Sequence, residues 1–354
     1  MDGNAIIYCQ GAYMTPNGKT AHGLVRHTDR YRILSVIDAN CNGKDAGELL
    51  DGKFRNIPVL DSVDAGIRHA QSINVIPDYL VVGLAPDGGM VGREALQDIQ
   101  KAIVSGLNID SGLHDFLSEN PVLSEIAKKK GVTIRDIRKP PSRKELHFFS
   151  GKIKDVNCIK IAILGTDSAI GKRTTALSLT RGFSDRGYKT VMIGTGQTSW
   201  LQGIQYSIVL DSLINDFVSG EIEHIIFTAW KNENPDLIIL EGQGSLLNPA
   251  YPGGFELIAA GRPDFIVLQH APGRKEYDGF PGYKIQPLDY QIKAIEIISG
   301  KPVIAITINH EKIDKNELPT VKKNILKDTG LPAFDILWDG TEEIINFIID
   351  RMNL

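Results

Sequence analysis

The chain has 354 residues, of which 42% are hydrophobic and 23% are charged, and its formal net charge at pH 7 is -4. This length allows two domains with a core each, and the composition is typical of a soluble globular protein. The mildly acidic balance gives no electrostatic reason to expect a nucleic-acid partner.

The sequence offers no targeting or cross-linking signal. No apolar run approaches the roughly 20 residues that a membrane span needs, and the first residues do not resemble a signal peptide. The cysteines Cys9, Cys41 and Cys158 lie far apart and form no Cys-x-x-Cys pair, which argues against a disulfide framework or a zinc site. We therefore expect a cytoplasmic protein that binds a small molecule and has neither a membrane nor a nucleic-acid partner.

Residues 1–142 alternate short apolar strands with helical segments, which predicts a Rossmann-like α/β domain with a parallel sheet. We expect strands at 4–8, 31–38, 58–60, 79–83 and 132–136, and helices at 93–105 and 121–130. The polar stretch 108–112 is interpreted as a loop. The pair Pro140 and Pro141 then breaks regular structure and predicts a domain boundary.

A second α/β domain is predicted over residues 152–354. Its expected strands are continuous apolar runs, as in a parallel sheet that is covered on both faces, and they lie at 158–164, 190–193, 236–240, 264–268 and 302–308. An amphipathic helix at 341–352 closes the domain. The predicted fold class is therefore α/β, with two doubly wound domains.

The segment after the strand 158–164 carries the strongest functional signal. A phosphate needs backbone N–H groups at a helix N-terminus and a cation, which Gly171 and Lys172 can supply. The Walker A pattern is irregular, because Thr166 and Arg173 replace its first glycine and its hydroxyl residue, so that Thr174 or Thr175 must supply the hydroxyl. The predicted cofactor-binding residues are Gly165, Thr166, Asp167, Ser168, Ala169, Ile170, Gly171, Lys172, Arg173, Thr174 and Thr175.

Residues that follow the other strands are further candidates, because doubly wound sheets bind ligands beyond the carboxyl ends of their strands. Glu241 leaves the strand 236–240 at a position like that of a Walker B acid, with a structural cap as the alternative. His270 is a candidate base or anion contact, or a structural residue. Four residues are candidates for substrate binding or for plain structural connections: Thr195, Gln197, Thr198 and Arg274.

The stretch 209–217 has an apolar helical pattern that contains Asp211 and Asp216. A carboxylate that faces a phosphate loop can hold magnesium, directly or through water. Either aspartate can equally be a solvated helix residue. Asp211 is the better candidate of the two for a metal ligand or a catalytic base.

Two resemblances sharpen these expectations. Residues 165–172 with 241–244 resemble dethiobiotin synthetase, which implies a P-loop NTPase-like second domain. Nearly the whole chain resembles a bacterial and archaeal family with a Rossmann-like first half and a P-loop second half, whose signatures match 165–167, 171–172, 174–175, 195–198, 211 with 216–217, and 241–245. This resemblance implies N-acetylation of D-glutamate by acetyl-CoA, a step in D-amino-acid breakdown.

The acetyltransferase hypothesis is compatible with the loop, because coenzyme A carries a pyrophosphate. The catalytic candidates are Lys172 for the oxyanion, with Asp211, Glu241 or His270 as the base. The sequence does not indicate which half of the chain binds coenzyme A. It also leaves open whether the protein forms a homo-oligomer.

Two other hypotheses remain. The first is a kinase or ligase that uses ATP and magnesium in the manner of dethiobiotin synthetase, with Thr174, Asp211 and Glu241 around the metal. The second is a nucleotide-binding protein without turnover.

Overall fold

The computed structural model describes residues 1–352 and divides the chain into two compact units. The first unit contains residues 1–141 and also 197–204, and the second contains the residues from 142 to 196 and from 205 onward. The predicted ranges, 1–142 and 152–354, did not include the return of 197–204 to the first unit. This short segment forms α7 (Gln197–Leu201), whose Leu201 is fully buried in the apolar core of the first unit.

The first unit is built on a parallel sheet of six strands in the order β3-β2-β1-β4-β5-β6. Its strands are β1 (Gly3–Tyr8), β2 (Tyr31–Ile37), β3 (Val59–Leu60), β4 (Tyr79–Val82), β5 (Asn108–Ser111) and β6 (Ile134–Asp136). One face carries α1 (Lys19–Arg26), α2 (Ala46–Asp51) and α7, and the other carries α3 (Val63–Ser72), α4 (Arg93–Val104) and α5 (Pro121–Lys130). The sheet therefore has a buried cluster on each face, as expected for a Rossmann-like domain.

The prediction of a loop at 108–112 is wrong, because Asn108–Ser111 forms strand β5. Asp110 and Ser111 are buried in the sheet, and Asp110 has no exposed surface. Arg135 on the neighbouring strand β6 donates to both carboxylate oxygens of Asp110 at 2.6 Å, and the hydroxyl of Tyr31 also donates to it. Aspartate is disfavoured in strands, but a carboxylate that is paired in this way can be buried in one.

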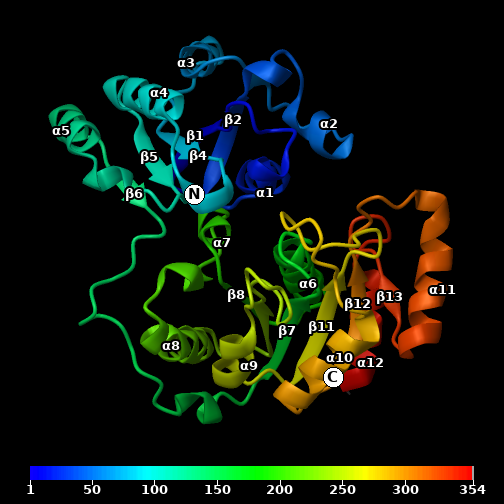
Figure 1. Cartoon of the computed structure of the whole chain (residues 1–354). Coiled ribbons are helices and arrows are strands. Elements are labelled where there is room, and N and C mark those ends of the chain that lie inside the picture. The colour runs from blue at the N-terminus through cyan, green and yellow to red at the C-terminus, as the bar shows by residue number, and fades with distance from the viewer. Residues whose placement is uncertain (353–354) are drawn as a thin grey trace. The chain divides into compact units, whose positions relative to one another are not determined.

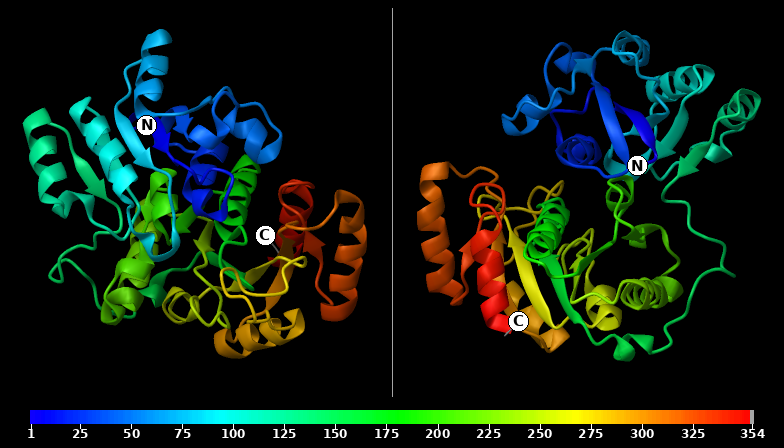
Figure 2. Two further views of the ribbon diagram at one scale, coloured as in Figure 1. Left: turned by 45° about the horizontal axis from the view of Figure 1, so that its top comes forward. Right: turned by 180° about the vertical axis from the view of Figure 1, so that it is seen from behind.

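The second unit contains a parallel sheet of seven strands in the order β13-β12-β11-β7-β10-β8-β9. Figure 1 labels β13, β12, β11, β7 and β8 of this sheet. Its strands are β7 (Ile159–Gly165), β8 (Thr190–Gly194), β9 (Tyr206–Ser207), β10 (Leu237–Glu241), β11 (Phe265–His270), β12 (Val303–Ile308) and β13 (Ala333–Phe334). Its helices are α6 (Lys172–Asp185), α8 (Asn215–Glu233), α9 (Phe255–Gly261), α10 (Leu288–Ser299), α11 (Leu318–Thr329) and α12 (Glu342–Met352). Figure 2 shows this sheet from two further sides.

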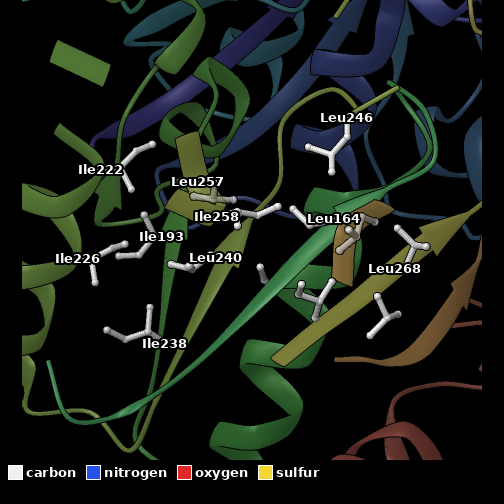
Figure 3. Packing of buried hydrophobic residues seen from close by; sticks show 14 of the residues in the cluster. Leu164, Ile193, Ile222, Ile226, Ile238, Leu240, Leu246, Leu257, Ile258 and Leu268 are labelled. Atoms are coloured by element: carbon white, nitrogen blue, oxygen red, sulfur yellow. The ribbon is translucent and has the colours of Figure 1, made fainter. Parts of the chain in front are cut away.

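Alternating side chains of the second sheet bury against helices on opposite faces. Leu164, Leu240 and Leu268, from three neighbouring strands, lie with Ile222 of α8 and Leu257 of α9 in one cluster (Figure 3). Full burial of such a side chain contributes about 1.5–3 kcal/mol each. The central strands β7, β10 and β11 are thereby fixed, and their carboxyl ends are rigid supports for the loops that follow.

The helical pattern at 209–217 is only partly realised. A short 3-10 turn covers Leu210–Ser212, and α8 begins at Asn215. Asp211 therefore lies in the turn, Asp216 lies in the first turn of α8, and both are exposed. No helix in the described part of the chain is long and apolar enough to cross a membrane.

Candidate functional site

The loop between β7 and α6 has the geometry of an anion-binding site. It covers residues 166–171, with Ala169 and Gly171 in left-handed conformations at φ values of 50° and 101°. No side chain caps the N-terminus of α6. Because the first amide groups of a helix have no partner within the helix, they are suited to bind a phosphate here.

Lys172 is the cation of this loop. Its side chain is only 7% exposed, and its Nζ atom donates a hydrogen bond of 2.6 Å to the carbonyl oxygen of Asp167. Burial lowers the pKa of Lys172 to about 8, although the carboxylates of Asp167 and Glu241 act in the opposite direction. Gly165 makes room for this arrangement, because a Cβ atom there would lie 2.8 Å from Cδ of Lys172.

Asp167 is fully buried and organises the loop rather than facing a ligand. Its Oδ1 accepts from the amide of Ser168 and from Asn248, and its Oδ2 accepts from Arg274 and from the amide of Asp278, all at 2.7–2.9 Å. Ser168 belongs to the phosphate loop itself, Asn248 to the loop after β10, and Arg274 and Asp278 to the loop after β11. Asp167 therefore connects three loops at the carboxyl edge of the sheet.

Arg274, a predicted substrate contact, takes part in this network. Besides Asp167, its guanidinium contacts Oε2 of Glu311 at 2.5 Å and the carbonyl oxygen of Ser168 at 3.0 Å. The side chain of Arg274 is 9% exposed and pairs with two carboxylates. This geometry favours a role in fixing the loops over a role in binding substrate.

Glu241 lies at the end of the central strand β10, next to the phosphate loop in the sheet. Its Oε2 accepts from the amide of Thr195 at 3.0 Å, and its carbonyl oxygen accepts from the Thr195 hydroxyl at the same distance. Thr195 is almost fully buried by this contact. Glu241 and Thr195 thus hold the ends of β10 and β8 together, and Glu241 contributes negative charge near Lys172.

Two hydroxyl groups, one from Thr166 in the phosphate loop and one from Thr175 in the first turn of α6, point toward β11. The Thr166 hydroxyl lies 3.0 Å from Nδ1 of His270, and the Thr175 hydroxyl donates to Gln269 at 2.5 Å. Because the hydroxyl of Thr175 is committed to the sheet, the half-buried Thr174 is the better candidate to contact a phosphate or its metal. Burial lowers the pKa of His270 to about 4, so its ring is neutral near pH 7 and is a weak base.

Gln197 and Thr198, which we expected beside Thr195, belong to the first unit. The hydroxyl of Thr198 lies 3.0 Å from that of Thr20 on α1, and Thr198 is 2% exposed. Gln197 packs against Gly112, where a Cβ atom would lie 2.6 Å from its Cγ. The sequence cluster 195–198 is therefore divided between two units.

The magnesium ligands expected from the sequence are Thr174, Asp211 and Glu241, a set that contains two carboxylates. Among residues 1–352, no group of three or more His, Cys, Asp or Glu side chains is arranged to hold a metal ion. Asp211 and Glu241 are consequently not joined by a third such ligand. Magnesium at P-loops is held largely by substrate phosphates and water, so this finding leaves the ATP hypothesis to experiment.

Several residues that contact the loop were missed by the sequence reasoning. Asn248 donates to Asp167, and Asn309 donates at 3.0 Å to the carbonyl oxygen of Ile170. Asn309 directly follows β12, so the rule that ligands bind beyond strand ends could have found it. Asn248 lies seven residues beyond β10, and no pattern marked it.

The fold and the site together define the protein as a two-domain α/β protein with a Rossmann-like unit and a P-loop unit. The family model of the DUF1611 P-loop domain, a domain of unknown function, matches residues 147–345, and its Rossmann-like N-terminal domain matches residues 39–140. The chain belongs to this DUF1611 family. A crystal structure of a DUF1611 family protein from Anabaena variabilis is similar over 98% of this chain and 99% of that chain, with a TM-score of 0.90 and 29% identity.

Two curated relatives match three quarters of the chain. A protein of Tritonibacter scottomollicae named D-glutamate N-acetyltransferase is 29% identical over 75% of this chain and 80% of its own length. A protein of the same name from a Pseudoalteromonas species is 30% identical over 75% of this chain and 79% of its own length. The predicted resemblance to this family and the predicted fold class are confirmed.

Proposed function

We propose that this protein transfers the acetyl group of acetyl-CoA to the amino group of D-glutamate. The observation that carries the proposal is the name of the two curated relatives, which match three quarters of the chain. The anion site at the N-terminus of α6 supports it, because acetyl-CoA is an anionic nucleotide that such a site can bind.

In this proposal the loop 166–171 and the first turn of α6 bind the pyrophosphate of coenzyme A. The uncapped amide groups of α6 donate to its oxygens, and Lys172 turns from the carbonyl oxygen of Asp167 to the phosphate. The half-buried Thr174 adds a hydroxyl donor in this proposal. A bound anion also favours the charged form of Lys172, which burial alone disfavours.

The acetyl group itself lies at the far end of the pantetheine arm, away from the pyrophosphate. Lys172 therefore serves to bind the donor, and the reaction depends on other groups near the thioester. There the amine nitrogen attacks the carbonyl carbon, the carbon–sulfur bond breaks, and the thiol of coenzyme A leaves. Lys275 is exposed and is a candidate partner for a substrate carboxylate now that Arg274 is seen to be paired.

The test is to incubate the protein with D-glutamate and acetyl-CoA and to measure free thiol, with L-glutamate as the stereochemical control. Lys172→Ala is expected to weaken coenzyme A binding by about 10- to 100-fold, since a hydrogen bond to a charged group contributes about 1.5–3 kcal/mol. The matched control is Lys154→Ala, which removes an exposed lysine of the same unit. Unchanged coenzyme A affinity in Lys172→Ala would exclude this loop as the donor site.

A parallel incubation with ATP and magnesium tests the kinase or ligase alternative. Release of ADP that requires a carboxylate substrate, without thiol release from acetyl-CoA, would favour that alternative. Binding of a nucleotide without either product would favour a binding protein.

A further inference from the structure

A histidine beside the phosphate loop is held in the manner of a catalytic base. His310 follows β12 by two residues, and its Nδ1 lies 2.7 Å from Oδ2 of Asp335. Its ring also stacks on the indole of Trp338, with ring centroids 3.7 Å apart and planes 2° apart. The imidazole is thus fixed both in position and in orientation.

Asp335 has the properties of a group that orients a histidine. It follows β13, has no exposed surface, and its Oδ1 accepts from the amides of Leu337 and Trp338 at 3.0 Å. A carboxylate only accepts hydrogen bonds, so Nδ1 of His310 carries the hydrogen and Nε2 is left as the atom that can accept a proton. The His310 side chain is 26% exposed, so a substrate can reach it.

The residues on both sides of His310 are linked to the phosphate loop, Asn309 directly and Glu311 through Arg274. Asn309 donates to the carbonyl oxygen of Ile170, and Glu311 pairs with Arg274, which in turn pairs with Asp167. His310 is therefore adjacent to the donor site without being part of it.

The bases that the sequence suggested are less suitable. His270 is neutral near pH 7 and weakly basic, and its Nδ1 contacts Thr166. Glu241 is 6% exposed and accepts from the amide of Thr195. Asp211 lies in an exposed turn before α8.

We propose that His310, oriented by Asp335, is the general base of the acetyl transfer, an assignment that rests on the proposed function. The ammonium group of the substrate first loses one proton to solvent. As the carbon–nitrogen bond forms and the carbon–sulfur bond breaks, Nε2 of His310 takes a second proton from the nitrogen and delivers it to the departing sulfur. The products are the N-acetyl amino acid and coenzyme A with a free thiol.

The test compares His310→Ala, Asp335→Asn and a control, His147→Ala, with the wild-type protein. His147 is an exposed histidine of the same unit that pairs with Glu221. A general base contributes about 10²- to 10⁴-fold, so we expect kcat of His310→Ala to fall at least 100-fold, while KM for acetyl-CoA changes less than threefold. Added imidazole should restore at least a tenth of the lost rate, and Asp335→Asn should lower kcat about tenfold or more.

Each outcome bears on one of the two proposals. A wild-type protein that does not acetylate D-glutamate overturns the proposed function itself. If the wild type is active, a kcat of His310→Ala within threefold of wild type overturns the assignment of the base. Loss of activity that imidazole does not restore also overturns it, as does an equal loss in His147→Ala. If His310→Ala does not fold, judged by circular dichroism, His310→Gln replaces it under the same criteria.

Discussion

Replacing Asp167 by asparagine tests whether this buried carboxylate organises the phosphate loop. The substitution keeps the size of the side chain but replaces one acceptor oxygen by a donor amide. Asn248 cannot adapt by turning its own amide, because its oxygen accepts from the amides of Ala250 and Tyr251. In either orientation of the new amide, two of the four hydrogen bonds to position 167 become contacts between donors.

The expected cost follows from these contacts. Breaking a buried ion pair by removing one partner costs about 3–5 kcal/mol, and Arg274 retains Glu311 as a second partner. We therefore expect a loss near the lower end, about 3 kcal/mol. For a folding unit of about 200 residues, 1 kcal/mol shifts the melting temperature by about 2–4 °C. The transition of the second unit should then fall by about 6–12 °C.

Differential scanning calorimetry at pH 7 measures this shift. Asp278→Asn is the matched control, because it removes a neighbouring charge but keeps the backbone amide that donates to Asp167. It should melt within about 2 °C of wild type, as expected for substitutions away from buried networks. The reasoning is refuted if Asp167→Asn also melts within 2 °C of wild type.

Three other predictions follow from the same structure. Because burial lowers the pKa of Lys172 to about 8, calorimetric affinity for coenzyme A should fall as pH rises from 7 to 9.5, and Lys172→Arg, which stays charged, should show a flat profile. Burial alone would raise the pKa of Glu223, but the amides of Ser150 and Ile153 outweigh this effect and hold that pKa below its usual range. The ionised form therefore stabilises the fold above about pH 4. Glu223→Gln should lower the free energy of unfolding in denaturant titrations at pH 7, and its difference from wild type should vanish as pH falls below about 4. Gly242→Ala places a Cβ atom 2.3 Å from a backbone carbonyl oxygen of β7 and should lower the free energy of unfolding by about 1–3 kcal/mol. The control is Gly92→Ala, whose Cβ atom meets no atom within 4 Å. An equal or smaller loss of stability in Gly242→Ala than in this control would contradict the prediction.

Much of the architecture could be predicted because the strands are long apolar runs. Continuous Ile, Leu and Val stretches identify β7, β10, β11 and β12, and the order of glycine, lysine and threonine after β7 identifies the phosphate loop. The two-residue strands β9 and β13 have no pattern of their own, since they are fixed only by pairing with β8 and β12. Strand β5 was missed because Arg135, 25 residues away, makes its aspartate compatible with a sheet.

The candidate site was harder to predict than the fold, because sequence position does not reveal what a polar group already contacts. Arg274 and Thr195 have suitable chemistry for a substrate, yet their polar groups are committed to Asp167 and Glu241. His310 was overlooked because its partner Asp335 lies 25 residues away at the end of a two-residue strand. Long-range partners of this kind are visible only in the folded chain.

The return of α7 to the first unit affects the order in which the chain can fold. Trp200 stacks against Arg30, and Leu201 fills the core beside α1, so this unit is incomplete until residue 204 has been synthesised. By then the ribosome has already made the strands β7 and β8 of the other unit. A nascent chain stopped after residue 141 therefore lacks a piece of its core, and the two units cannot be separated by a single cut.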